Sequence, residues 1–290
     1  MKVAFIGVGN MGAPMAANIA KGGHEVFVHD SDVNKASKLA PQIGAKALGG
    51  MSEIASVEVV VTMLPDGKAV RSVALDEDGI ATFAKPGTIV IDMSSSQPLI
   101  TRETGAALAT KGVTLIDAPV SGGVERAAKA TLTIMIGGDD PAAIEKAKGV
   151  LSCMGSTFFE VGALGSGHVA KSLNNVVAAA NFGVLAEAMR VAERYGINPE
   201  TLVNMISTST GQSFMSNVAM KHAVLPRTYN SGFKVGLLAK DVSIAAELGK
   251  DLGCATPFMQ LAQQRWQLAR DLLGPDEDNT KAYVAWWEKK

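Results

Sequence analysis

From Met1 to about Gly162, short apolar runs alternate with stretches of helical periodicity. The apolar runs are rich in Val, Ile and Phe and end at Gly, Pro or Asp, which is typical of β-strands. Strands that alternate with helices indicate a mainly parallel, doubly wound sheet. The expected strands are Val3–Ile6, Val26–His29, Val57–Met63, Thr88–Asp92, Val113–Ile116, Thr131–Ile136 and Thr157–Val161.

The pattern changes after Gly162. No convincing strand follows Gly167, and one long helical pattern at 167–195 is stopped by Gly196 and Pro199. We therefore expect an α/β domain over residues 1–162 and an all-α domain over residues 163–290, which begins with the long interdomain helix. Further helices are expected at Pro199–Ser207, Gly236–Leu252 and Pro257–Leu273.

Charge and composition exclude several classes of protein. Lys plus Arg is 27 and Asp plus Glu is 28, so the net charge of −1 gives no support for nucleic-acid binding. No apolar run reaches the roughly 18 residues of a membrane span, and the N-terminus does not read as a signal peptide. Cys153 and Cys254 lie too far apart for a disulfide framework, which favours a cytoplasmic protein.

A glycine-rich segment, Gly7-Val8-Gly9-Asn10-Met11-Gly12, lies between the first expected strand and the first helix. In this context a G-x-G-x-x-G pattern is typical of dinucleotide binding. The glycines permit a tight turn and close approach of a pyrophosphate to the start of a helix. The sequence thus predicts a Rossmann domain with Gly7, Gly9, Asn10, Met11 and Gly12 at the cofactor. A purely structural glycine turn is the alternative.

Asp30 ends the second expected strand, where a carboxylate accepts hydrogen bonds from the ribose hydroxyls of NAD and repels the 2′-phosphate of NADP. Ser31, Asp32 and Val33 follow, with no Arg among them. NAD is therefore expected, and NADP less so. The alternative is that Asp30 only caps the next helix, a role that Ser31 or Asp32 could also fill.

Lys171, Asn174 and Asn175 lie near the start of the long helix, and spacings of three and four place them on one side of it. A helix that bridges two domains presents that side to the cleft between them, where ligands commonly bind. Lys171 is the candidate general acid/base. A solvated surface lysine is the alternative, but two amides in an apolar segment need polar partners.

A second candidate site follows an expected strand at Asp117-Ala118-Pro119-Val120-Ser121-Gly122-Gly123. Its paired glycines leave backbone N–H groups open, and Ser121 adds a hydroxyl. Such a concavity suits a carboxylate, although a plain loop would have the same composition.

Six segments together resemble the β-hydroxyacid dehydrogenase family, and within it the 3-hydroxyisobutyrate dehydrogenases. They occur in the family's order and span essentially the whole chain. The segments are Phe5–Met15, Thr62–Pro65, Ile91–Ser95, Asp117–Gly123, Gly165–Asn175 and Ala239–Asp241.

The resemblance implies a role for each segment. Lys171 would take the hydroxyl proton of the substrate as a hydride passes to the nicotinamide, a reaction that needs no metal. The helical domain would bind substrate and form homodimers or homotetramers. Ser121, Gly122, Gly123, Asn175 and Asp241 would bind the hydroxyacid, while Leu64, Pro65, Ser95 and Lys240 would lie near the cofactor.

Departures from the family pattern leave the substrate open. Arg126 and Ala130 stand where the family usually has glycines, and Ser209–Phe214 replaces a segment that commonly carries Arg and Trp. The main hypothesis is NAD-dependent oxidation of a 3-hydroxyisobutyrate-like β-hydroxyacid to its semialdehyde or ketoacid. The alternatives are a reductase for tartronate or succinic semialdehyde, a threonate- or serine-type dehydrogenase, and a non-catalytic nucleotide-binding module.

Overall fold

The computed structural model describes residues 1–288, so the last two residues of the expected helical domain lie outside it. The chain forms two compact units. The first runs from Met1 to Lys171 and the second begins at Ser172. The division falls within one long helix, α8 (Ser166–Tyr195), which begins shortly after the last strand ends at Gly162. No described helix is long and apolar enough to cross a membrane.

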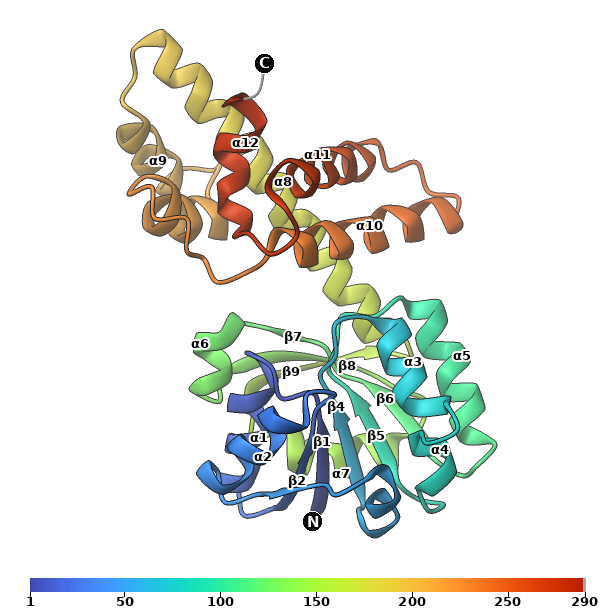
Figure 1. The fold of residues 1–290 in the computed structure, drawn as a ribbon. Helices are drawn as coiled ribbons and strands as arrows, with labels where there is room; N and C mark the ends of the chain where they lie inside the picture. Colours follow the sequence, from blue (N-terminus) through green and yellow to red (C-terminus); the bar gives the residue numbers. More distant parts are fainter. Residues whose placement is uncertain (289–290) are drawn as a thin grey trace. The chain divides into compact units, whose positions relative to one another are not determined.

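The first unit is built around a nine-stranded sheet of order β3-β2-β1-β4-β5-β6-β8-β7, with β9 also paired to β8 (Figure 1). All pairs are parallel except β6–β8 and β7–β8, which confirms the expected mainly parallel sheet. The strands are β1 (Lys2–Ile6), β2 (Glu25–His29), β3 (Lys46–Ala47), β4 (Val59–Thr62), β5 (Ile89–Asp92), β6 (Thr114–Asp117), β7 (Val120–Ser121), β8 (Leu132–Gly137) and β9 (Gly155–Gly162).

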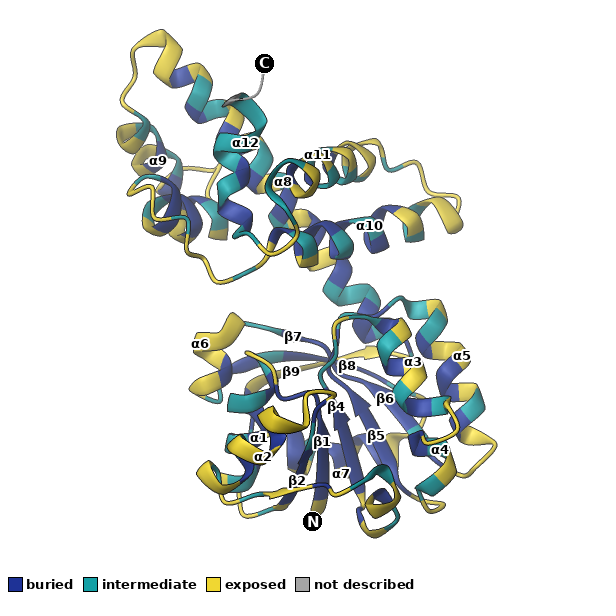
Figure 2. Ribbon diagram, in the orientation of Figure 1, coloured by how far each residue is buried: buried dark blue, intermediate teal, exposed yellow. Residues whose placement is uncertain are grey.

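Helices cover both faces of this sheet because successive strand residues point to opposite sides. Val3 and Phe5 of β1 pack in one apolar cluster, whereas Ala4 and Ile6 pack in another. Figure 2 shows the central strands as almost uniformly buried. The covering elements are α1 (Gly12–Lys21), α2 (Val33–Gln42), α6 (Gly123–Ala128) and α7 (Pro141–Leu151) on the first cluster, and the 3-10 helix η1 (Met51–Ser56), α3 (Gly67–Leu75), α4 (Ile80–Phe83) and α5 (Pro98–Ala109) on the second.

The parallel arrangement brings the carboxyl ends of β1, β4, β5 and β6 to one edge of the sheet. Ile6 pairs with Thr62, Thr62 with Asp92 and Asp92 with Asp117, so the turns that follow these strands meet there. This edge is where open α/β sheets bind their ligands.

The second unit is helical. Its core forms around Phe182 of α8, whose ring lies 5.5 Å from that of Trp266 and 6.0 Å from that of Trp286. The indole N–H of Trp266 donates to the carbonyl of Ala179, so a large buried aromatic also has its polar atom paired. Its other elements are α9 (Pro199–Ser207), the π-helical segment η2 (Met215–Val224), α10 (Val235–Asp251), α11 (Pro257–Leu273), the 3-10 helix η3 (Asn279–Lys281) and α12 (Ala282–Glu288).

The expected helices at Pro199–Ser207, Gly236–Leu252 and Pro257–Leu273 are confirmed to within a residue at each end. The elements that were not expected include the two-residue strands β3 and β7, the short helix α6, the segment η2, η3 and α12. The supposed loop after β6 therefore contains a strand, in which Ser121 pairs with Thr133.

Candidate active site

The turn after β1 requires glycine at two positions for internal reasons. Gly7 has φ +96°, and a Cβ there would lie 2.4 Å from the carbonyl oxygen of Met63. A Cβ on Gly12 would lie 1.9 Å from the carbonyl oxygen of Gly7. Gly9 differs, because a Cβ there would meet nothing within 4 Å. The exposed backbone at Gly9 is therefore open to a ligand, which fits the close approach of a pyrophosphate. Asn10 is exposed and Met11 half-buried beside it.

Asp30 is 9% exposed and holds this turn in place. Its Oδ2 accepts a 2.9 Å hydrogen bond from the N–H of Val8, and its Oδ1 accepts one of 3.0 Å from the N–H of Asp32. The cap of α2 is Asp32, whose side chain accepts from the N–H of Asn34. The role of Asp30 is thus distinct from helix capping. The ammonium of Lys35, a residue that sequence reasoning did not single out, lies 4.0 Å from Asp30.

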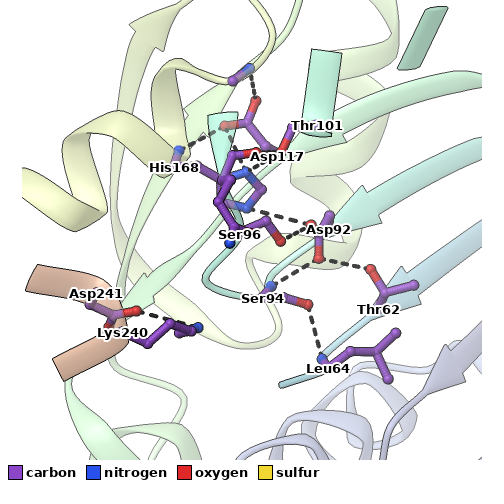
Figure 3. A network of polar contacts seen from close by, with 12 residues as sticks. Thr62, Leu64, Asp92, Ser94, Ser96, Thr101, Asp117, His168, Lys240 and Asp241 are labelled. Atoms are coloured by element: carbon purple, nitrogen blue, oxygen red, sulfur yellow. Dashed lines mark hydrogen bonds and ion pairs between the residues drawn. The ribbon is translucent and has the colours of Figure 1, made fainter. Parts of the chain in front are cut away.

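The turns after β4 and β5 are joined through Asp92, which is 1% exposed (Figure 3). Its Oδ1 accepts from the hydroxyl of Thr62 (2.9 Å) and the N–H of Ser94 (3.0 Å). Its Oδ2 accepts from the hydroxyl of Ser96 (2.9 Å). The hydroxyl of Ser94 in turn accepts the N–H of Leu64 at 2.9 Å. Asp92 thereby fixes both turns on which the expected nicotinamide-side residues lie.

The three residues expected on the nicotinamide side differ in how exposed they are. Leu64 and Ser95 are half-buried, and Pro65 is exposed. Leu64 also lies against the glycine turn, since its Cδ2 would be 3.0 Å from a Cβ on Gly7. The structure thus brings together the glycine turn and the β4 turn.

The segment expected to bind substrate leaves β7 through two glycines in the left-handed region, Gly122 at φ +140° and Gly123 at φ +67°. Ser121 and Gly122 are half-buried and Gly123 is exposed. Helix α6 begins at Gly123 and is tied to α1, because the side-chain amide of Asn18 donates a 2.7 Å hydrogen bond to the carbonyl of Ala127. The segment expected to bind substrate is therefore anchored to α1, the helix that follows the glycine turn.

Helix α8 is fixed at its start by Asp117, the last residue of β6. The Asp117 carboxylate accepts the N–H groups of Gly165 (2.7 Å) and His168 (2.8 Å). It satisfies backbone donors that a helix start leaves open. A Cβ on Gly167 would lie 2.8 Å from Asp117 Oδ2, so glycine is required for this contact. Lys171, which is half-buried, follows His168 by one turn.

One turn further along α8, in the second unit, Asn175 contacts Asp241 of α10. The Asn175 side-chain amide donates a 2.6 Å hydrogen bond to Asp241 Oδ2. It also accepts one of 3.1 Å from Asn174, which is exposed. The Lys240 ammonium lies 3.3 Å from Asp241 Oδ1. Asn175 and Asp241 are 7% and 2% exposed, so this pair is almost fully buried.

Sequence reasoning missed the roles of Asp92, Asp117 and His168, which meet in the core of the first unit. His168 and both carboxylates are at most 1% exposed. The one available signal was an aspartate ending each of two otherwise apolar strands. Within residues 1–288, no group of three His, Cys, Asp or Glu side chains could hold a metal ion.

Comparison with known protein families finds matches for both parts of the chain. Residues 2–162 match the NAD-binding domain of 6-phosphogluconate dehydrogenase. Residues 165–286 match the NAD-binding domain of NADP-dependent 3-hydroxyisobutyrate dehydrogenase.

Individual relatives match over nearly their full length. The chain is 34% identical to 2-(hydroxymethyl)glutarate dehydrogenase of Eubacterium barkeri, over 100% of this chain and 95% of that protein. It is 35% identical to the NAD-dependent L-serine dehydrogenase of Pseudomonas aeruginosa, over 92% and 91% of the two chains. The solved structure of Mycobacterium tuberculosis 3-hydroxyisobutyrate dehydrogenase with L-serine superposes with a TM-score of 0.90, at 32% identity over 99% of each chain. The chain therefore belongs to the β-hydroxyacid dehydrogenase family, and it is an NAD-dependent oxidoreductase that acts on CH–OH groups.

Proposed function

We propose that the protein oxidises a small, 3-hydroxyisobutyrate-like β-hydroxyacid to its semialdehyde or ketoacid, with Lys171 as general acid/base. The observation that carries this proposal is the placement of Lys171 on α8. One turn before it, the helix is anchored by Asp117, and one turn after it, Asn175 is held by Asp241. A lysine between two fixed turns of helix has a defined position, as proton transfer requires.

The reaction needs one proton and one hydride to leave the alcohol. NAD, when bound, would supply the acceptor for the hydride of the hydroxyl-bearing carbon. Lys171 in its neutral form takes the hydroxyl proton, and the carbon–oxygen bond becomes a carbonyl. Ser121 and the N–H groups of Gly122 and Gly123 hold the substrate carboxylate. Asn175, oriented by Asp241, donates to the reacting oxygen.

The residues present fit the dinucleotide. The backbone at Gly9 has free space beside it, and the Asp30 carboxylate accepts a hydrogen bond from the N–H of Val8 in the same turn. Leu64, Pro65, Ser95 and Lys240 are proposed to lie near the nicotinamide. The same residues would serve the reverse reaction on tartronate or succinic semialdehyde, and oxidation of threonate or serine. The name of the Pseudomonas aeruginosa relative supports the serine-type alternative.

The test of the proton-transfer role is Lys171→Met, which removes the amine but keeps much of the apolar stem. We expect kcat to fall by roughly 10² to 10⁴, because general acid/base groups contribute in that range. The dissociation constant for NAD should change little. A variant that keeps half of the wild-type kcat would exclude Lys171 from proton transfer.

A specific observation favours a second candidate substrate class, hydroxyacids with two carboxylates. Arg126 lies directly over the substrate segment, since a Cβ on Gly122 would come within 2.8 Å of its Cδ and 3.2 Å of its Nε. Its neighbour Glu125 pairs with Lys129 at 2.6 Å, and the described residues offer Arg126 no ion pair of its own. An exposed guanidinium beside a carboxylate-binding segment suits a second carboxylate, such as that of a hydroxyglutarate.

This alternative is tested with Arg126→Ala and a matched control, Lys129→Ala, which removes a cation at the C-cap of the same helix that is already paired with Glu125. Arg126→Ala should lower kcat/KM about tenfold or more for hydroxy-dicarboxylates, since a charged hydrogen bond contributes roughly 1.5 to 3 kcal/mol. The value of kcat/KM for monocarboxylates should fall much less. Equal losses for both substrate classes would exclude a second carboxylate at Arg126.

We further propose that the protein is a homodimer or homotetramer assembled through its helical unit. Three exposed valines on α8 support this assembly: Val177, Val184 and Val191, which are 57%, 68% and 70% exposed at seven-residue spacing. Such an apolar stripe is typical of an interface. A cytoplasmic location is proposed because Cys153 and Cys254 are both free thiols.

A further inference from the structure

Three ionisable side chains meet in the core of the first unit and take no part in the reaction steps above. Asp92 ends β5, Asp117 ends β6, and His168 lies in the first turn of α8 (Figure 3). The Nε2 atom of His168 is 3.5 Å from Asp92 Oδ2, and its Nδ1 atom is 3.7 Å from Asp117 Oδ2. Burial of such groups costs free energy unless each finds partners. Their presence in the core therefore calls for a function.

The partners define how the imidazole ring is held. Nδ1 lies 2.8 Å from the hydroxyl of Thr101 on α5. Nε2 has no hydrogen-bond partner among the described residues, and Asp92 Oδ2 is the polar atom that faces it. A carboxylate oxygen can only accept, so a proton on Nε2 makes this contact attractive, whereas a lone pair there would be repelled. We therefore assign the ring proton to Nε2, directed toward Asp92, so that Nδ1 accepts from the Thr101 hydroxyl.

This ring joins two sets of contacts that would otherwise be separate. Through Asp92 it reaches Ser94, whose hydroxyl accepts the N–H of Leu64 in the β4 turn. Through its own backbone N–H it is bound to Asp117, which fixes the start of α8. Lys171 lies one turn after His168 on that helix. The imidazole therefore connects the proposed nicotinamide-side turns to the helix that carries the proposed base.

We propose that His168 is a positioning residue that sets the distance between Lys171 and the β4 and β5 turns. The proposal rests on the assignment of Lys171 as the base. His168 touches neither substrate nor cofactor in this account, and it acts through the helix. Misplacement of a catalytic group by about 1 Å is enough to cost on the order of 10² in rate. Loss of the imidazole contacts should therefore reduce kcat more than it weakens NAD binding.

The first experiment compares His168→Leu with His168→Gln. Leucine removes both ring contacts, whereas the glutamine amide has a donor for Asp92 and an acceptor for Thr101. We expect kcat of the leucine variant to fall by about 10², with KM for NAD changed less than threefold. The His168→Gln variant should keep most of the wild-type kcat. The proposal is overturned if the two variants have equal kcat, or if the loss disappears after correction for the folded fraction.

Helix α5 supplies a matched pair of threonines for the second experiment. Thr101 and Thr104 are 3% and 1% exposed, and the Thr104 hydroxyl has no hydrogen-bond partner among the described residues. Both can be changed to valine at nearly constant shape. Thr101→Val removes the His168 contact, together with a 3.1 Å hydrogen bond to the carbonyl of Gln97 in the preceding turn, and should lower kcat several-fold, whereas Thr104→Val should leave kcat unchanged. Equal kcat values for the two variants would contradict the proposal.

A double-mutant cycle separates positioning from stability. In the Lys171→Met background the base is already absent, so His168→Leu should cost less than twofold in the residual kcat. A purely structural role would give the same fold-loss with and without Lys171, and that result overturns the proposal. Failure of the proposed function is recognised separately, because Lys171→Met alone would then keep wild-type kcat.

Discussion

The Asp30 carboxylate is held by the backbone and keeps acceptor positions that a ligand could use. Each of its oxygens accepts one backbone N–H, from Val8 in the glycine turn and from Asp32. A carboxylate has about four acceptor positions, so it can also bind the ribose hydroxyls of NAD. A substitution at Asp30 therefore changes the shape of the turn as well as the charge that faces the cofactor.

We expect Asp30→Asn to narrow the preference for NAD over NADP mainly because kcat/KM with NAD falls. The amide replaces one acceptor oxygen with a donor, and that donor then faces a backbone N–H. The loss should be tenfold or more, since a hydrogen bond to a charged group contributes about 1.5 to 3 kcal/mol. The control is Asp32→Asn, which changes only the exposed cap of α2. A rise in NADP activity with unchanged NAD activity would show that Asp30 acts through charge alone.

At the scale of elements, the glycines in the turn between β1 and α1 differ in role. Some are required by the folded backbone, whereas one leaves space for a ligand. Gly12→Ala would place a Cβ 1.9 Å from the carbonyl oxygen of Gly7, whereas Gly9→Ala meets nothing within 4 Å. We expect Gly12→Ala to lower the melting temperature by several degrees. Gly9→Ala should keep the melting temperature of the free protein and raise the dissociation constant for NAD. Calorimetry and titration measure the two effects, and a normal NAD affinity for Gly9→Ala would contradict the proposed site.

The sequence was sufficient for elements whose signal is local. Apolar runs predicted β1, β2, β4, β5, β6 and β8, because a strand buried on both faces shows as a continuous apolar segment. The strands β3 and β7 have two residues each, too few for any periodicity. The π-helical segment η2 (Met215–Val224) also lay outside the prediction, and its helical repeat differs from the α-helical period that was searched for.

The candidate site likewise combines residues that a local motif predicts with residues that only the folded chain brings together. Gly7, Gly12 and Asp30 belong to a local motif, and the structure gives each a geometric reason. The contact of Asp117 with His168 joins residues 51 apart in sequence, and neither residue alone signals a buried cluster. Contacts of this kind are created by the order of strands in the sheet, which sequence periodicity does not specify.

At the scale of the whole molecule, the helical unit carries an apolar surface that the proposed assembly would cover. Val184 lies at the middle of the exposed stripe on α8. We expect Val184→Lys to convert the oligomer to a smaller species in sedimentation velocity, because a buried charge without a partner is costly. Val33→Lys is the control, since Val33 is 65% exposed on α2 of the other unit. An unchanged sedimentation coefficient for Val184→Lys would place the interface elsewhere.

The most direct test of the enzymatic account is the hydroxyacid-dependent reduction of NAD by the wild-type protein, followed by NADH absorbance. The panel contains 3-hydroxyisobutyrate, serine, threonate, tartronate-type hydroxyacids and a hydroxy-dicarboxylate, each with NAD and with NADP. We predict saturable NADH formation with at least one β-hydroxyacid, a higher kcat/KM with NAD than with NADP, and loss of turnover in Lys171→Met. Failure of every β-hydroxyacid with NAD, together with failure of the matching semialdehydes with NADH, would contradict the account.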